Sequence, residues 1–202
     1  MNEGYIKFEC ERIDEISITD DMIFELNETR TKLYDQGLIG ITDGIGFGNI
    51  SIRNGSAFII SGTQTGGIRE LTVNDYVEVI ESDLINNKII CKGRINASSE
   101  SLTHAVVYEC SREINSVIHV HNEKLWNSIL NRVPTTDPEN EFGSVELALN
   151  IQRLLQSGSA LKQGIIAMAG HHAGVITFGK DLKTALKTLI DYYNPRLCIR
   201  EL

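Results

Sequence analysis

Two segments on either side of an Asn-Gly pair constrain the fold more than any other feature of the chain. The segment GIGFGNISIR (44–53) is glycine-rich and then alternates between apolar and polar residues, which is typical of a loop that enters a strand. The segment SAFIIS (56–61) follows Asn54 and Gly55, a pair that favours tight β-turns. The sequence therefore predicts an antiparallel hairpin near the first quarter of the chain.

The rest of the chain interleaves predicted helices and strands. Helices are expected over residues 19–36, 98–113, 123–131, 143–158 and 181–193. Strands are expected in a second hairpin, 75–82 with 87–93, and at 116–121, 164–170 and 174–179. The continuous apolar run at 164–170 predicts a central strand, and Glu100 is expected in the first turn of helix 98–113, where a carboxylate suits the helix dipole. This order predicts an α/β fold of three layers, α/β/α, with a central, mainly antiparallel sheet.

Composition limits the classes of protein to consider. The 202 residues suit one domain over 1–202, with residues 1–18 as an N-terminal extension. A net charge of −8 opposes nucleic-acid binding, no apolar run is long enough to span a membrane, and the N-terminus lacks the pattern of a secretion signal. The four cysteines are scattered without a CxxC pair, which disfavours a disulfide framework or a thiolate zinc site and is typical of the cytoplasm.

Four of the five histidines are expected at the ends of two strands. His119 and His121 lie at i and i+2 of SVIHVH, so both imidazoles are predicted on one face. His171 and His172 follow the apolar run 164–170. Two such ends could meet in a three-histidine metal site, and the alternative is a hydrogen-bonded pair of histidines at a sheet edge. Burial of two unpaired imidazoles would be costly, which favours the metal.

Five blocks in order, GNISIR, SGTQTG, SSESLTH, VIHVH and GHHAGVITFG, resemble the class II aldolase/adducin family, which includes L-fuculose-phosphate aldolase. The resemblance runs from about residue 20 to 193. It implies the same three-layer fold and a homotetramer with active sites between neighbouring subunits. It also implies a metal-dependent lyase that cleaves a sugar phosphate, or a related hydroxy-carbonyl compound, through a metal-stabilised enediolate.

The resemblance also implies roles for individual residues. His119 and His121 match the metal ligands, and the third ligand is His171 or His172. Counting along the strand from the apolar run GIIAMAG favours His171, whereas alignment with the second histidine of the aldolases' His-His-Gly favours His172. Both are not expected to bind one ion, because adjacent strand residues face opposite ways. The expected ion is Zn²⁺, with Mn²⁺ or Co²⁺ as alternatives. Glu100 matches the catalytic acid/base. The residues that match the phosphate pocket are Gly48, Asn49, Thr65, Gly66, Ser98 and Ser99.

The sequence departs from the family pattern in the segment 131–148, which is short and contains no tyrosine to act as proton donor. The particular reaction therefore stays open. A dehydratase, decarboxylase or epimerase on the same metal platform is one alternative. A non-catalytic binding module like the adducin head is another, although such heads lack the metal ligands.

Overall fold

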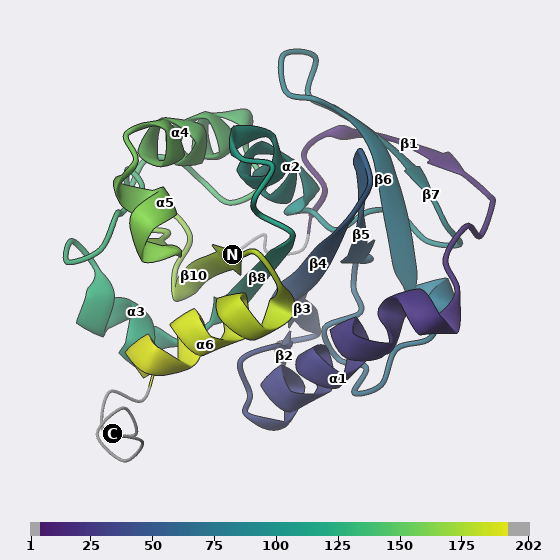
Figure 1. Cartoon of the computed structure of the whole chain (residues 1–202), viewed down its shortest axis with the longest axis horizontal. Coiled ribbons are helices and arrows are strands. Elements are labelled where there is room, and N and C mark those ends of the chain that lie inside the picture. Colours follow the sequence, from purple (N-terminus) through teal and green to yellow (C-terminus); the bar gives the residue numbers. More distant parts are fainter. Residues whose placement is uncertain (1–4, 194–202) are drawn as a thin grey trace.

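The computed structural model describes residues 5–193, and eight strands form its main sheet. The strands lie in the order β1-β7-β6-β5-β4-β8-β10-β9, and all neighbouring pairs are antiparallel except β1 and β7 (Figure 1). They are β1 (Glu9–Ile13), β4 (Asn49–Asn54), β5 (Ala57–Ser61), β6 (Tyr76–Asp83), β7 (Lys88–Lys92), β8 (Ser116–His121), β9 (Ile165–Ala167) and β10 (Gly174–Gly179). The short strands β2 (Gly40–Thr42) and β3 (Ile45–Phe47) pair separately.

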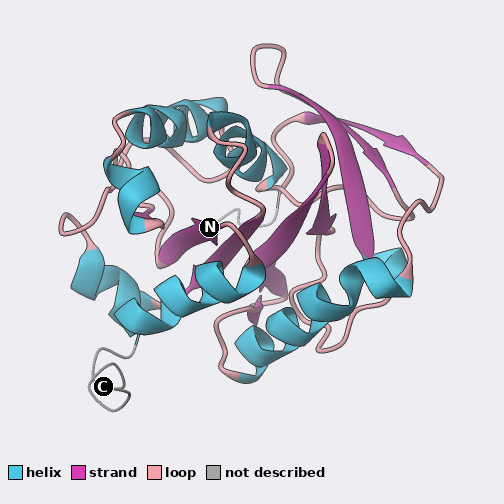
Figure 2. Cartoon of the chain, in the orientation of Figure 1, coloured by secondary structure: helices cyan, strands magenta, loops and turns pink. Residues whose placement is uncertain are grey.

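Helices cover both faces of the sheet (Figure 2). They are α1 (Asp20–Asp35), α2 (Ser101–Cys110), α3 (Glu123–Ile129), α4 (Val145–Gln156), α5 (Ser159–Gln163) and α6 (Leu182–Tyr193), with a 3-10 turn at Val73–Asp75. One apolar core lies between the sheet and α2, α4 and α5, and a second lies between the sheet and α1, α3 and α6. The predicted three-layer fold is therefore confirmed. Within residues 5–193, no helix is long and apolar enough to cross a membrane.

The predicted hairpin is formed by β4 and β5. Asn54 pairs with Ala57, so the two loop residues are Gly55 and Ser56, one position later than the Asn-Gly pair suggested. Gly55 has φ of 62°, a value that glycine adopts at little cost and that the first loop position of such turns favours. The turn fixes the register of β4 with β5. On its other side β4 pairs with β8, where Asn49 lies opposite His119.

The strand β8 lies inside the sheet and has one core on each of its faces. Val117 packs into the core under α2, whereas Ile118 and Val120 pack into the core over α6. All three side chains are fully buried, and each burial contributes roughly 1.5–3 kcal/mol. Because side chains alternate along a strand, His119 and His121 lie on the face of Val117, toward α2.

The expectation that 164–170 forms a central strand is wrong. Its strand β9 spans three residues and lies at the end of the sheet order, beside β10 alone. It is nevertheless buried, because the segment before α4 covers its free edge. Ala167 N donates to Pro134 O at 2.9 Å, and Thr136 N donates to Ala167 O at 3.0 Å. A continuous apolar run reports burial, which here comes from a covering loop rather than from a central place in the sheet.

Two further differences concern the helix that carries Glu100 and the N-terminal segment. The helix α2 begins at Ser101, so Glu100 occupies the N-cap position and not the first turn. Residues 98–100, directly before the helix, form a tighter turn in which Ser101 N donates to Ser98 O at 2.9 Å. The strand β1 was not predicted, and its residues are mostly exposed. It belongs to the sheet because it pairs in parallel with β7.

Candidate active site

Three histidine side chains meet at one end of the sheet. His119 and His121 come from β8, and His171 lies in the turn between β9 and β10. This turn is closed by hydrogen bonds from His171 N to Met168 O at 3.2 Å and from Gly174 N to His171 O at 2.8 Å. One ring nitrogen from each histidine lies within 4.8 Å of the others, so the three residues form a group that could hold a metal ion.

A backbone carbonyl sets the tautomer of His119. Its Nδ1 lies 3.2 Å from Val175 O, and because a carbonyl only accepts, Nδ1 carries the proton. The lone pair of the neutral ring is then on Nε2, which lies 3.1 Å from His121 Nε2. Two nitrogens bound to one tetrahedral zinc ion, with Zn–N bonds of about 2.0–2.1 Å, would be ~3.3 Å apart. The donor set therefore fits a divalent metal ion.

Burial keeps these imidazoles neutral. Desolvation lowers the pKa of His119 to about 4. Desolvation also lowers the pKa values of His121 and His171 well below their usual range, and the charges of neighbouring histidines lower them further. Neutral imidazole is the form that binds metal, so at neutral pH no proton competes at these sites.

His172 lies outside the cluster. Its side chain is 60% exposed, and its Nε2 lies 3.8 Å from Glu123 Oε1. Its ring centroid lies 5.4 Å from that of Trp126, on the outer side of the turn. Of the two adjacent histidines, only His171 belongs to the group that could hold a metal.

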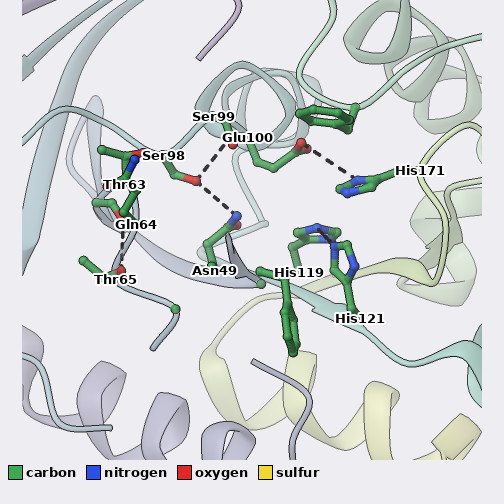
Figure 3. A pocket seen from close by; sticks show the side chains of 16 residues that line it. Asn49, Thr63, Gln64, Thr65, Ser98, Ser99, Glu100, His119, His121 and His171 are labelled. Carbon is green, nitrogen blue, oxygen red and sulfur yellow. Dashed lines mark hydrogen bonds and ion pairs between the residues drawn. The ribbon is translucent and has the colours of Figure 1, made fainter. Parts of the chain in front are cut away.

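Glu100 faces His171 across the pocket (Figure 3). Its Oε1 lies 3.9 Å from His171 Nδ1, and the residue is 3% exposed. The backbone holds it firmly, because Glu100 N donates to Ser98 Oγ at 3.3 Å and His104 N donates to Glu100 O at 3.0 Å. A carboxylate is thus fixed beside the histidine cluster.

The six residues expected to bind phosphate all line this same pocket, namely Gly48, Asn49, Thr65, Gly66, Ser98 and Ser99. Asn49 Nδ2 donates to Ser98 Oγ at 3.1 Å (Figure 3). Ser98 Oγ therefore accepts from both Asn49 and Glu100 N, which leaves its own proton to donate elsewhere. The amides of Thr65 and Gly66 donate to no acceptor within residues 5–193. The pocket thus offers donors to an anion.

Two of these residues must be glycine. Gly48 has φ of 75°, and a Cβ there would lie 2.8 Å from the side chain of Ile39. A Cβ on Gly66 would lie 2.3 Å from Gly40 O and 2.8 Å from Phe47 N, which are backbone atoms of the β2–β3 hairpin. The loop after β5 and this hairpin can approach each other only because Gly66 has no side chain.

Several residues around the pocket were not predicted from the sequence. Phe142 lines the pocket and its ring centroid lies 5.3 Å from that of His171. Lys7 Nζ lies 4.2 Å from the centre of the Phe142 ring and 2.8 Å from Glu141 Oε2. No lysine or arginine is among the described residues that line the pocket itself. The position of Phe142 in the sequence did not indicate a role at the site. Only the folded chain brings Phe142 and Lys7 to the rim of the pocket.

A buried guanidinium holds the loop after β5 from the side away from the pocket; this loop (residues 62–67, GTQTGG) is called the glycine-rich loop below. Arg30 is 1% exposed and donates to three backbone carbonyls, Thr65 O at 2.7 Å, Ile68 O at 2.6 Å and Arg69 O at 3.1 Å. The guanidinium of Arg30 thus places positive charge behind Thr65, one of the residues that line the pocket. An arginine on a helix with polar neighbours is expected to be exposed, so this contact could not be predicted from the sequence.

Behind the cluster, His104 belongs to a buried polar chain. Its Nδ1 lies 2.7 Å from Ser51 Oγ, which lies 2.7 Å from the hydroxyl of Tyr108. Burial lowers the pKa of His104 well below its usual range, and the charge of His119 adds to this effect. These contacts tie α2, which follows Glu100, to β4, which carries Asn49.

The chain matches the family model described as "Class II Aldolase and Adducin N-terminal domain" over residues 25–193. Among curated proteins it is 28% identical, over 166 residues, to an L-fuculose phosphate aldolase of Methanocaldococcus jannaschii. That alignment covers 75% of this chain and 80% of the relative.

Solved structures share the fold. A structure of an L-fuculose 1-phosphate aldolase superposes with a TM-score of 0.66 at 21% identity, covering 90% of this chain and 87% of the other. A sugar-phosphate aldolase from Thermotoga maritima superposes with a TM-score of 0.64 at 18% identity, covering 89% and 94% of the two chains.

Proposed function

The chain belongs to the class II aldolase and adducin N-terminal domain family, and from this premise we propose that it is a metal-dependent lyase acting on a sugar phosphate or a related hydroxy-carbonyl compound. The observation that carries the proposal is the presence of three imidazoles, two buried and one half-buried, one buried carboxylate and a set of anion-type donors in a single pocket. A fold that served only for binding or assembly would have no need to bury these groups together.

We assign the metal site to His119, His121 and His171. The proposed ion is Zn²⁺, since three neutral imidazoles with an open position are typical of catalytic zinc, and Mn²⁺ or Co²⁺ are the alternatives. A bound ion would supply a Lewis acid that polarises a carbonyl and stabilises negative charge on its oxygen. The bond from His119 Nδ1 to Val175 O supports this assignment, because it orients the ring before the ion arrives.

We assign proton transfer to Glu100. A carboxylate held between a backbone turn and His171 can accept a proton from a substrate hydroxyl or carbon and return it after a bond has broken. Its burial excludes bulk water from the exchange. His171 Nδ1, 3.9 Å away, limits the positions that the carboxylate can take.

We place the anionic end of the substrate among the glycine, asparagine, threonine and serine donors, with Gly48, Asn49, Thr65, Gly66, Ser98 and Ser99 as its contacts. The molecule has a net charge of −8, so local positive charge must offset this field. Arg30, behind Thr65, and Lys7, at the rim, supply it. Phosphate binding here would hold the reactive carbons near Glu100.

One observation favours a second candidate reaction. No tyrosine is among the described residues that line the pocket, and Tyr192 and Tyr193 pack into the core on the opposite face of the sheet. Within residues 5–193, the pocket thus has no tyrosine as proton donor for the leaving aldehyde. An epimerase, dehydratase or decarboxylase using the same metal and carboxylate is therefore the alternative.

We further propose one domain over residues 1–202, located in the cytoplasm and assembled as a tetramer. Three apolar side chains near the glycine-rich loop support assembly, since Phe24, Ile41 and Ile68 are 65%, 55% and 44% exposed. A Cβ on Gly67 of this loop would lie 3.3 Å from the side chain of Ile41, so a neighbouring subunit seated here would lie beside the pocket. Light scattering on the purified protein tests the assembly, and a monomer at all concentrations would contradict it.

A product screen distinguishes the candidate reactions. Zinc-loaded protein would be incubated with aldose and ketose phosphates, and the products separated by chromatography and identified by mass spectrometry. A lyase gives two shorter fragments, an epimerase gives an isomer of unchanged mass, and a dehydratase or decarboxylase gives loss of water or of carbon dioxide. We expect fragments; phosphate-ester binding without any product would favour the non-catalytic module.

A further inference from the structure

Two thiols lie together outside the histidine pocket. Cys10 Sγ and Cys91 Sγ are 3.9 Å apart, and neither residue lines the histidine pocket. Both are free thiols, Cys91 buried and Cys10 partly exposed. They are separated by 81 positions in the sequence, so only the folded chain brings them together.

The sheet holds the two residues in position. Cys10 pairs with Ile89 and Arg12 pairs with Cys91 in the parallel ladder of β1 and β7, so the two cysteines are diagonal neighbours on one face. A disulfide needs the sulfurs to approach to about 2.05 Å, which requires a small local shift. β1 can make this shift because it is an edge strand with mostly exposed residues.

The environments of the two thiols are unequal. The contact with the Cys91 thiol lowers the pKa of Cys10, and the charge of Arg12 acts in the same direction. The same contact, together with burial, raises the pKa of Cys91. Cys10 is therefore the thiol of the pair that loses its proton more readily, and the thiolate is the nucleophilic form.

We propose that Cys10 and Cys91 form a peroxide-sensitive redox pair, in which oxidation closes a disulfide between β1 and β7. This site is independent of the proposed lyase activity. Paired thiols of this kind in reducing compartments are typically transient and redox-sensing rather than structural.

One hydroperoxide molecule oxidises one pair of cysteine thiols to a disulfide. The Cys10 thiolate attacks the peroxide oxygen, the O–O bond breaks, and Cys10 becomes a sulfenic acid while the alcohol, or water from hydrogen peroxide, leaves. The Cys91 sulfur then attacks the Cys10 sulfur, the S–O bond breaks, and the Cys91 proton leaves in a water molecule. The two thiols lose two electrons and the peroxide gains them.

The test counts thiols before and after oxidation. The full chain would be treated with hydrogen peroxide, denatured, alkylated with N-ethylmaleimide and mapped by mass spectrometry. We expect two fewer alkylated thiols, a mass lower by about 2 Da before alkylation, and linked peptides that contain Cys10 and Cys91. Four alkylated thiols after treatment, or links that involve Cys110 or Cys198, would overturn the proposal.

Variants distinguish Cys10, which reacts with the peroxide, from Cys91, which closes the disulfide. Cys91→Ser is expected to abolish the link and leave a sulfenic acid on Cys10 that dimedone captures, and failure of this capture would remove Cys10 as the reacting thiol. Cys110→Ser is the matched control. Cys110 is also partly exposed, but burial raises its pKa, and its replacement should leave the link unchanged.

Discussion

At the scale of single residues, Glu100 combines burial with closeness to the cluster. Its carboxylate lies 3.9 Å from His171 Nδ1 and its backbone is fixed by the turn at 98–100. It also lies under Gly143, where a Cβ would be 3.9 Å from Glu100 Oε1. Little room exists for the side chain to leave the pocket.

Replacing Glu100 by glutamine separates catalysis from metal binding. The amide has nearly the same shape but cannot accept and return a proton, so turnover should fall by about 10²–10⁴-fold. Metal content should stay as in wild type, because the three histidines are untouched. Steady-state rates and elemental analysis of the same preparation check both points.

The control for this prediction is Glu123→Gln, since Glu123 is exposed and lies beside His172. Its rate should equal that of wild type. Undiminished turnover in Glu100→Gln would remove Glu100 from the mechanism.

The histidine spacing shows what can be predicted residue by residue. The HxH pattern predicts His119 and His121 on one face, because a strand has a period of two. In the structure both lie on β8 and share a face. The choice between His171 and His172 could not be derived with the same rule. Both lie in a turn, where side-chain direction depends on φ and ψ rather than on alternation.

At the scale of elements, α1 and the glycine-rich loop act as one unit. Arg30 of α1 donates to the carbonyls of Thr65, Ile68 and Arg69. Tyr34, one turn further, donates from its hydroxyl to Gly67 O at 3.3 Å. The helix therefore fixes the loop that lines the pocket.

Replacing Arg30 by methionine should destabilise the protein strongly. The change leaves buried carbonyls without donors, at about 1–3 kcal/mol for each, so a loss of ~3 kcal/mol or more in the free energy of unfolding is expected. Urea denaturation measures it. Lys32→Met, an exposed change on the same helix, should alter stability by less than about 0.5 kcal/mol. Equal stabilities for the two variants would contradict the proposed link.

Elements differ in how far local sequence determines them. The β4–β5 hairpin follows from alternation and a turn pair, and α4 follows from apolar periodicity, because both signals are local. The place of β9 at the edge and the existence of β1 depend on partners distant in sequence, namely the segment around Pro134 and strand β7. The rim formed by Lys7 and Phe142 could not be predicted for the same reason.

At the scale of the whole molecule, four imidazoles with lowered pKa values lie in or beside the core, three of them buried and that of His121 half-buried. Burial lowers the pKa values of His104, His119, His121 and His171 below the usual value of 6.5. Below pH 6.5 the unfolded chain therefore binds protons that the folded chain does not. Acid consequently favours unfolding.

Stability of the metal-free protein should thus be highest above pH 6.5 and fall toward pH 4. Each imidazole contributes a slope of up to about 1.4 kcal/mol per pH unit. Urea denaturation in the presence of a chelator, at several pH values, tests this expectation. His172→Gln should keep the same slope because His172 is exposed, and a flat profile in wild type would contradict the burial of neutral rings.

Metal content tests the central claim most directly. Protein purified without an affinity tag would be analysed for metals as wild type and as the variants His119→Ala, His171→Ala and His172→Ala. We predict about one divalent ion per chain in wild type and in His172→Ala, and loss of the ion in the other two. No bound metal in wild type, even after zinc, manganese or cobalt is supplied, would contradict the assignment of this pocket as a metal-dependent active site.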